Sequence, residues 1–98
     1  YFVQALAAVP EGDRRLLDNV AVVASSDCSF GAEHDIIEYP ILIAGSAGGA
    51  LVSGEHIRAE GEVASKVSFS LLRAVGASVQ RFGVNEAEAT TGLTGLET

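Results

Sequence analysis

The pattern of apolar and polar positions divides this chain into a few short elements. The first predicted element is a helix within residues 1–10, YFVQALAAVP, where apolar side chains recur at helical spacing. The positions that share its apolar face are Phe2, Val3, Leu6 and Ala7. Pro10 forbids continuation of the helix. The polar stretch EGDRRLLDN that follows predicts a connector, with one turn around its two leucines.

Two later runs have the length and β-branching of strands. They are VAVVASS, residues 20–26, and YPILIAG, residues 39–45, with Pro40 near the start of the second run, where a strand tolerates proline. Neither run alternates between apolar and polar positions, which favours burial on both faces, as in a parallel sheet. The loop between them has about a dozen residues, longer than a usual hairpin turn.

The second half of the chain predicts a hairpin, a helix and a tail. Residues 50–59, ALVSGEHIRA, are interpreted as a short hairpin that turns at Ser53-Gly54. Residues 65–76, SKVSFSLLRAVG, have the clearest helical pattern, with Ser65 as the capping residue and Gly76 at a left-handed C-terminal cap. The apolar stripe of this helix is formed by Val67, Leu71, Leu72 and Val75. Beyond it, we expect an irregular tail held by Leu93 and Leu96.

This order of elements predicts an α/β fold with too few strands for a complete sheet. We therefore expect residues 1–81 to form an α/β segment that completes a larger sheet supplied elsewhere, and residues 82–98 to form an irregular acidic tail. The chain begins at Tyr1, inside the apolar face of the first helix and without a capping residue, so it is interpreted as a piece of a longer protein or a processed chain. Its expected partner is the remainder of the parent chain, or another protein that completes the sheet.

Composition excludes several classes of partner. The chain has 13 acidic and 6 basic residues, a formal charge of −7, so it lacks the clustered cations that bind nucleic acid or anionic membranes. No apolar run reaches the length of a membrane span, so no membrane insertion is expected. Its only cysteine, Cys28, has no partner within the chain for a disulfide.

The loop between the two predicted strands carries the candidate chemistry. Asp27 follows the first strand directly, and His34 lies seven residues later, beyond a turn at Gly31. Aspartate and histidine are ligands that Zn²⁺, Mn²⁺ and Fe-type ions accept, although a metal site needs at least three ligands. The alternative is a solvated loop, since Asp and Ser are ordinary turn formers. Cys28 adds a soft ligand or fills space as a small hydrophobe.

Other polar positions carry a weaker signal. Glu33 and Asp35 flank the histidine, and either is a candidate acceptor for its imidazole or simply a solvated charge. His56 is interpreted as a surface histidine on the predicted hairpin. The glycine run GSAGGA, residues 45–50, could hold phosphate through backbone N–H groups, but it lacks the spacing of known phosphate loops. Glycine for close packing explains this run equally well.

Residues Leu16 to Gly76 resemble the C-terminal part of a family of uncharacterised exported bacterial proteins, related to the alkaline phosphatase and sulfatase superfamily. The resemblance is carried, in collinear order, by the LLDN lead into a strand, the Ser-acid pair after it, a histidine, PILIAG, SGEHIR and the LL-x-x-x-G helix. It implies that the parent protein is an αβα sandwich with a large central sheet. It also implies a periplasmic or secreted location.

The same resemblance implies a metal-dependent phosphoric or sulfuric ester hydrolase in the full-length parent. Asp27 matches the acid of the superfamily's Asp-His pair, His34 is the candidate downstream ligand, and Cys28 stands where the pair has its histidine. The implied metal is divalent: zinc, manganese or calcium. The nucleophile and the remaining ligands would lie outside these residues, so this chain alone is not expected to be catalytic. The alternative is a secreted binding or scaffold module that keeps the fold with a degenerate site.

Overall fold

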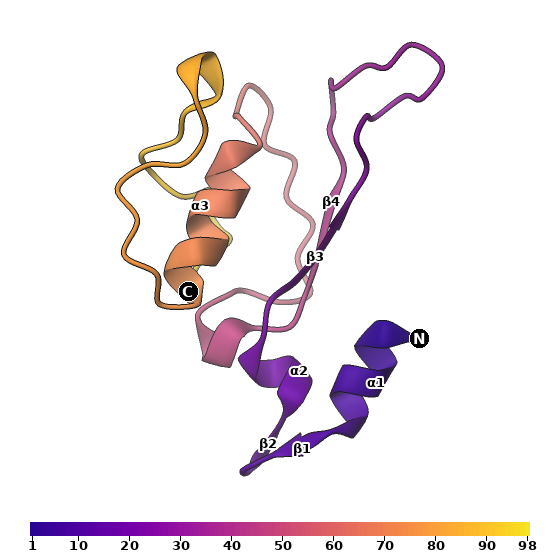
Figure 1. Ribbon diagram of the computed structural model, residues 1–98, viewed down its shortest axis with the longest axis vertical. Coiled ribbons are helices and arrows are strands. Elements are labelled where there is room, and N and C mark those ends of the chain that lie inside the picture. The colour runs from indigo at the N-terminus through magenta and orange to yellow at the C-terminus, as the bar shows by residue number, and fades with distance from the viewer.

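The computed structural model describes residues 1–98 and confirms a small mixed α/β domain. It contains three helices and two separate antiparallel sheets of two strands each. In chain order the elements are α1 (Phe2–Ala8), β1 (Pro10–Glu11), β2 (Arg14–Arg15), α2 (Leu16–Asn19), β3 (Val22–Ser25), β4 (Ile41–Ala44), the 3₁₀ turn η1 (Ala47–Gly49), α3 (Ser65–Ala74) and the 3₁₀ turn η2 (Asn85–Ala87). Figure 1 shows three parts: an N-terminal arm from α1 to α2, a long ribbon of β3 and β4, and α3 with the C-terminal segments around it.

The N-terminal arm follows the predicted pattern closely. α1 ends before Pro10, and the predicted turn of the connector is α2. Between the helices lies a short hairpin, in which Pro10 of β1 pairs with Arg15 of β2. Gly12 turns the chain there with a φ of 63°, a left-handed conformation that glycine adopts without steric cost. α1 packs against α2, and none of its residues is buried.

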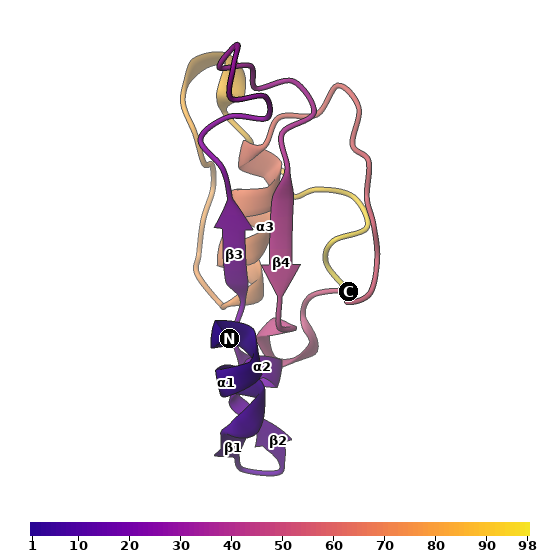
Figure 2. The ribbon, with the colours of Figure 1, turned by 90° about the vertical axis from the view of Figure 1, so that its right-hand side faces the viewer.

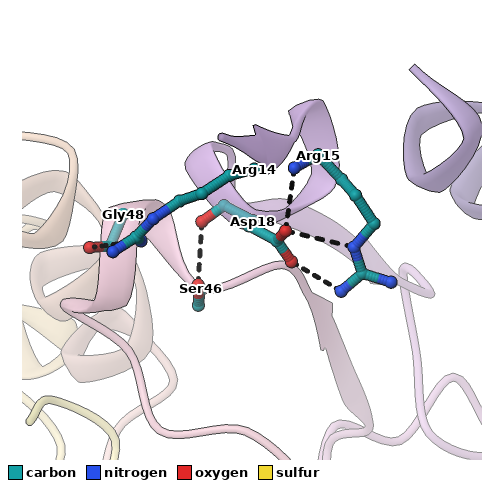
Figure 3. A network of polar contacts seen from close by, with 5 residues as sticks. All are labelled: Arg14, Arg15, Asp18, Ser46 and Gly48. Carbon is teal, nitrogen blue, oxygen red and sulfur yellow. Dashed lines mark hydrogen bonds and ion pairs between the residues drawn. The ribbon is translucent and has the colours of Figure 1, made fainter. Parts of the chain in front are cut away.

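A polar network joins the N-terminal arm to the turn that follows β4 (Figure 3). The carboxylate of Asp18 accepts hydrogen bonds from the backbone N–H and the guanidinium of Arg15, at 2.6 to 3.1 Å. The hydrogen bond from the Arg15 side chain lowers the pKa of Asp18 from 3.8 to about 2. Across the network, Ser46 Oγ donates to the Asp18 carbonyl oxygen at 2.8 Å, and Arg14 donates to the Gly48 carbonyl oxygen at 3.3 Å.

β3 and β4 form a continuous antiparallel ribbon, in which Val22 pairs with Ala44 and Ser25 pairs with Ile41. Directly opposed residues point to the same side of such a pair. The inner face, turned toward α3, carries Val23, Ser25, Ile41 and Ile43. The outer face carries Val22, Ala24, Leu42 and Ala44. Figure 2 views the ribbon from the side of this outer face, with α3 behind it.

The expectation of two fully buried strands in a parallel arrangement is wrong. The two strands are neighbours joined by the loop, so they run antiparallel, and no residue of either strand is buried. Leu42 on the outer face is 75% exposed and Val23 is 48% exposed. Because the two strand sequences do not alternate between apolar and polar residues, burial of both faces was expected. In the structure only the inner face of the ribbon is covered, by α3.

The predicted hairpin over residues 50–59 is also wrong. Leu51 forms an isolated antiparallel bridge with Glu97, and residues 52–64 contain no strand. The backbone N–H of Val52 donates to the Leu96 carbonyl oxygen at 2.9 Å. Gly54 does turn the chain, with a φ of 78°, but Ala50 and Val52 find their backbone partners in the distant tail, and no backbone hydrogen bond joins residues 50–52 to residues 55–59.

α3 is the best-packed element and confirms the predicted helix. Its residues Val67 and Leu71 join Leu51 and Leu96 in the main apolar cluster. Gly76 follows the helix with a φ of 88°, as expected for a left-handed cap, and its N–H donates to the Arg73 carbonyl oxygen at 2.9 Å. The predicted N-terminal cap differs: the capping position is Ala64, and no side chain makes a capping hydrogen bond.

The tail packs along α3 although it has little regular structure. Leu96 and Ala89 are buried, and Leu93 packs against the apolar cluster. Ser70 of α3 is completely buried, and its Oγ accepts a hydrogen bond from the Leu93 N–H at 2.9 Å. Gly92 is required beside this contact, because a Cβ there would lie 2.4 Å from Ser70 Oγ.

The molecule as a whole is open. Its radius of gyration is 14.5 Å and its extents are 43 × 33 × 20 Å, whereas a compact domain of this length has a radius near about 13 Å. Only 7 of the 98 residues are buried, and large apolar side chains are exposed on α1, the ribbon and the loop. None of the helices has the length and hydropathy to traverse a membrane.

Candidate functional site

The candidate site begins at the end of β3, where Asp27 is exposed at the start of the loop. Its Oδ1 accepts hydrogen bonds from the Ser26 hydroxyl at 3.2 Å and from the Cys28 thiol at 3.5 Å. The Cys28 thiol, and then the Ser26 hydroxyl, lower the pKa of Asp27 because both stabilise its charged form. Asp27 is therefore a carboxylate at neutral pH.

Cys28 is a half-buried free thiol beside that carboxylate. Its backbone N–H donates to Ser26 Oγ at 3.4 Å, so these three consecutive residues form one small hydrogen-bonded cluster. The cluster arises from local chain geometry, since every contact joins residues one or two positions apart. Such a turn presents an anionic carboxylate next to a soft sulfur atom.

His34 lies in a separate turn farther along the same loop. The bridge between Phe30 and Asp35 closes this turn, and the Ser29 N–H and Oγ both donate to the Asp35 carbonyl oxygen at 2.7 and 2.8 Å. His34 is exposed and has a φ of 53°, in the left-handed region. The Asp35 carboxylate accepts the Ile37 N–H at 2.8 Å, so it caps the turn instead of holding the imidazole.

Two long-range contacts hold the base of the loop. The hydroxyl of Tyr39 donates to the Ser26 carbonyl oxygen, which joins the two ends of the loop across the ribbon. The guanidinium of Arg58 pairs with the Glu38 carboxylate and so ties the loop to the segment that leads to α3. These two contacts hold the ends of the loop, whereas the turn that carries His34 is held by its own local hydrogen bonds.

The structure brings Asp27 and Cys28 together, whereas no hydrogen bond or ion pair joins either of them to His34. Nowhere in the chain do three or more His, Cys, Asp or Glu side chains gather closely enough to hold a metal ion. The residues present therefore do not by themselves make a complete site for zinc, manganese or calcium, each of which needs more ligands.

The two remaining sequence candidates have ordinary structural roles. His56 is exposed in the strandless segment after η1. The glycine run uses its backbone N–H groups within the chain: Ala47 donates to Val20 and Gly49 to Ser46, at 3.0 and 2.9 Å. Gly45 is required for close packing, since a Cβ there would lie 2.2 Å from the Val20 carbonyl oxygen. The run therefore serves turning and packing, the alternative given above.

Sequence reasoning missed a cavity of about 230 Å³ between the inner face of the ribbon and α3. Its lining is mostly apolar with some hydroxyl groups, and includes Val23, Ile41, Ser65, Ser68, Leu71 and Phe82. The apolar positions of both elements were evident in the sequence, but the gap between them depends on how the ribbon and the helix are spaced.

Comparisons with known protein families, with curated proteins and with solved structures find no match to this chain.

Proposed function

We propose that this chain is the C-terminal segment of a larger αβα-sandwich protein of the phosphatase and sulfatase kind. In that parent, it completes the central sheet and contributes late ligand positions for a divalent metal. The observation that carries the proposal is the half-covered ribbon: α3 lies on the inner face of β3 and β4, while the outer face is open and neither outward edge is paired.

The energetics of the ribbon support this proposal. A two-stranded ribbon alone is marginal in water, and stability requires more strands or a covering layer. Here Leu42 is 75% exposed on the outer face. Further strands beside the ribbon and a helix layer over its outer face would bury Leu42 and the other side chains of that face. The result would be the three-layered arrangement that the sequence resemblance implies.

Asp27 and His34 are better suited to contribute ligands to a metal site shared with the rest of the parent than to form a metal site by themselves. Asp27 is an exposed, ionised carboxylate just after the end of β3, where it accepts hydrogen bonds from Ser26 and Cys28, and His34 lies in the same loop. A divalent metal bound in the parent would polarise an ester oxygen or activate a nucleophile. The nucleophile and the other ligands would come from the rest of the parent protein. The resemblance also leads us to propose that the parent is periplasmic or secreted.

A second candidate is a secreted scaffold or binding module that has lost catalysis. It is favoured by Cys28, which stands at the position of the superfamily histidine and directs its thiol to Asp27 rather than into a cluster of donors. In this case the fold and its contacts would persist without a complete metal site.

The experiment is metal analysis of the purified full-length parent, with Asp27→Ala and the matched control Glu33→Ala. Both carboxylates are exposed in the same loop, but only Asp27 is held at the strand end. We expect bound zinc, manganese or calcium to fall at least about tenfold in Asp27→Ala and to stay unchanged in Glu33→Ala. Hydrolysis of aryl phosphates or sulfates should fall with the metal. Unchanged metal content in Asp27→Ala contradicts the ligand role, and a metal-loaded parent without turnover supports the scaffold instead.

A further inference from the structure

We propose that the cavity of about 230 Å³ between the inner face of the ribbon and α3 is a binding site for a small neutral amphiphile. Such a ligand has an aromatic or branched apolar body and carries one hydroxyl or carbonyl group. None of the candidate metal ligands lines this cavity, so the inference goes beyond the proposed function and does not depend on it.

Three segments of the chain form the apolar walls of the cavity. The ribbon contributes Val23 and Ile41, α3 contributes Val67 and Leu71, and the segment after α3 contributes Phe82. Val67 and Leu71 also belong to the main apolar cluster, so the cavity borders the packed core of the chain. These walls favour a ligand with an apolar body, because binding removes both that body and the walls from water.

The wall at Phe82 is held in place by backbone contacts. Phe82 and Ala89 exchange two backbone hydrogen bonds, at 2.9 and 2.7 Å, and Ala89 is buried. Next to Phe82, Gly83 lies so close to α3 that a Cβ there would be 2.8 Å from Ser65 Oγ. The cavity therefore has a fixed third wall without a ligand, which reduces the entropy lost on binding.

Serine residues from two elements line one end of the cavity. Ser25 is the last residue of β3, and Ser65 and Ser68 lie at the start of α3, which begins at the end of the ribbon that carries the loop (Figure 1). The serine side chains that form hydrogen bonds within the chain are those of Ser26, Ser29, Ser46 and Ser70. The three serines of the cavity therefore keep their hydroxyl groups available to a polar group of a ligand, both as donors and as acceptors.

The lining of the cavity also decides the charge and the size of the ligand. No Asp, Glu, Lys, Arg or His lines it, so a charged ligand would lose its hydration without gaining a counter-charge. The volume exceeds that of an apolar cavity of roughly 150 Å³ that holds benzene, so a single ring with a short polar substituent fits. Benzyl alcohol therefore has the chemistry that the cavity selects.

The test is an NMR titration of the isotope-labelled 98-residue chain with para-fluorobenzyl alcohol. Two related compounds serve as comparisons: para-fluorotoluene, which lacks the hydroxyl group, and para-fluorobenzoate, which is charged. We expect saturable binding of the alcohol, with the backbone amide shifts concentrated at residues 23–25 and 64–71. The benzoate should bind at least about tenfold more weakly than the alcohol.

Variants of α3 separate the role of the hydroxyl groups from that of the cavity. The double variant Ser65→Ala/Ser68→Ala should weaken binding of the alcohol at least about fivefold, through loss of a hydrogen bond, and leave para-fluorotoluene unchanged. Ser53→Ala, at an exposed serine outside the cavity, is the matched control and should change neither affinity. Ser68→Leu places a larger side chain in the cavity and should abolish binding of both compounds, while circular dichroism shows that the helix is kept.

Three results would overturn the proposal. They are no saturable binding of the alcohol, amide shifts centred on the outer face of the ribbon around Leu42, and a double variant that binds the alcohol as well as the wild type does. Equal weakening of the alcohol and of para-fluorotoluene in the double variant would likewise contradict it, since the hydroxyl groups would then have no specific role. None of these measurements needs a metal or the rest of the parent, so they are distinct from the test of the proposed function.

Discussion

The β3–β4 ribbon is richer in apolar residues than α3, yet only the α3 region is packed. All seven buried residues lie in α3, in the tail or at Leu51, and none lies in the ribbon or its loop. α3 receives cover from three directions: the inner face of the ribbon, the segment at Leu51, and the tail with Leu96. The ribbon receives cover from one direction only.

This difference shows that an apolar strand sequence favours burial but does not reveal whether other residues of the chain cover the strand. Burial of an apolar side chain stabilises a fold only where other atoms replace the water around it. In α3 the chain supplies those atoms itself, and in the ribbon it does not. The packed region is therefore expected to carry the stability of this chain, and the ribbon to carry its interactions.

The largest expected effect compares two leucines in the two regions. Leu51→Ala removes a side chain that is 3% exposed and should lower the free energy of unfolding by about 3 kcal/mol. Leu42→Ala removes one that is 75% exposed and should change it by less than about 0.5 kcal/mol. Denaturant titrations followed by circular dichroism measure both. Equal losses for the two variants would show that the ribbon is packed as well as α3.

A smaller effect concerns how the tail is attached to α3. Ser70→Ala leaves the part-buried Leu93 N–H without its acceptor and should cost about 1 to 2 kcal/mol. Ser68→Ala, two residues earlier on the same helix, removes a hydroxyl that makes no hydrogen bond within the chain and should be nearly neutral. Faster amide exchange in the tail of Ser70→Ala would locate the loss. A neutral Ser70→Ala would mean that the tail is held without this contact.

The smallest effect is electrostatic and lies at the base of the ribbon. The folded-state pKa of Asp18 is lowered to about 2, so its ion pair with Arg15 stabilises the fold above pH 4 and loses that contribution as the pH falls toward 2. Asp18→Asn should be less stable than the wild type at pH 6, and this difference should vanish near pH 2. Asp13→Asn, which removes a carboxylate outside the network, should follow the wild type. Thermal melts from pH 2 to 6 test the prediction, which fails if the difference between Asp18→Asn and the wild type does not change with pH.

The elements that were predicted well depend on neighbours in sequence. The end of α1 before Pro10, the turn of α2 and the left-handed cap at Gly76 each follow from a residue's own backbone preference. The clustering of Asp27 with Cys28 is equally local, since adjacent side chains meet without any tertiary contact, but the sequence-based prediction paired Asp27 with His34 and did not include it.

The elements that were predicted wrongly depend on distant partners. The local signal at Ser53-Gly54 indicated a hairpin, but Leu51 bridges to Glu97, a residue 46 positions away. The two strands were located correctly, whereas their direction and their exposure were not. No property of valine or isoleucine in a short run reveals whether one face or both will be covered.

The amino-acid sequence by itself determined the helices, the positions of the two strands and the acidic, cation-poor surface, because these follow from backbone preference, side-chain periodicity and charge. Only the tertiary structure decided that the strands pair antiparallel, that the tail completes the core around α3, and that one face of the ribbon stays open. Those outcomes depend on which segments meet in space, and the free energy of such contacts belongs to pairs of distant residues rather than to any local pattern.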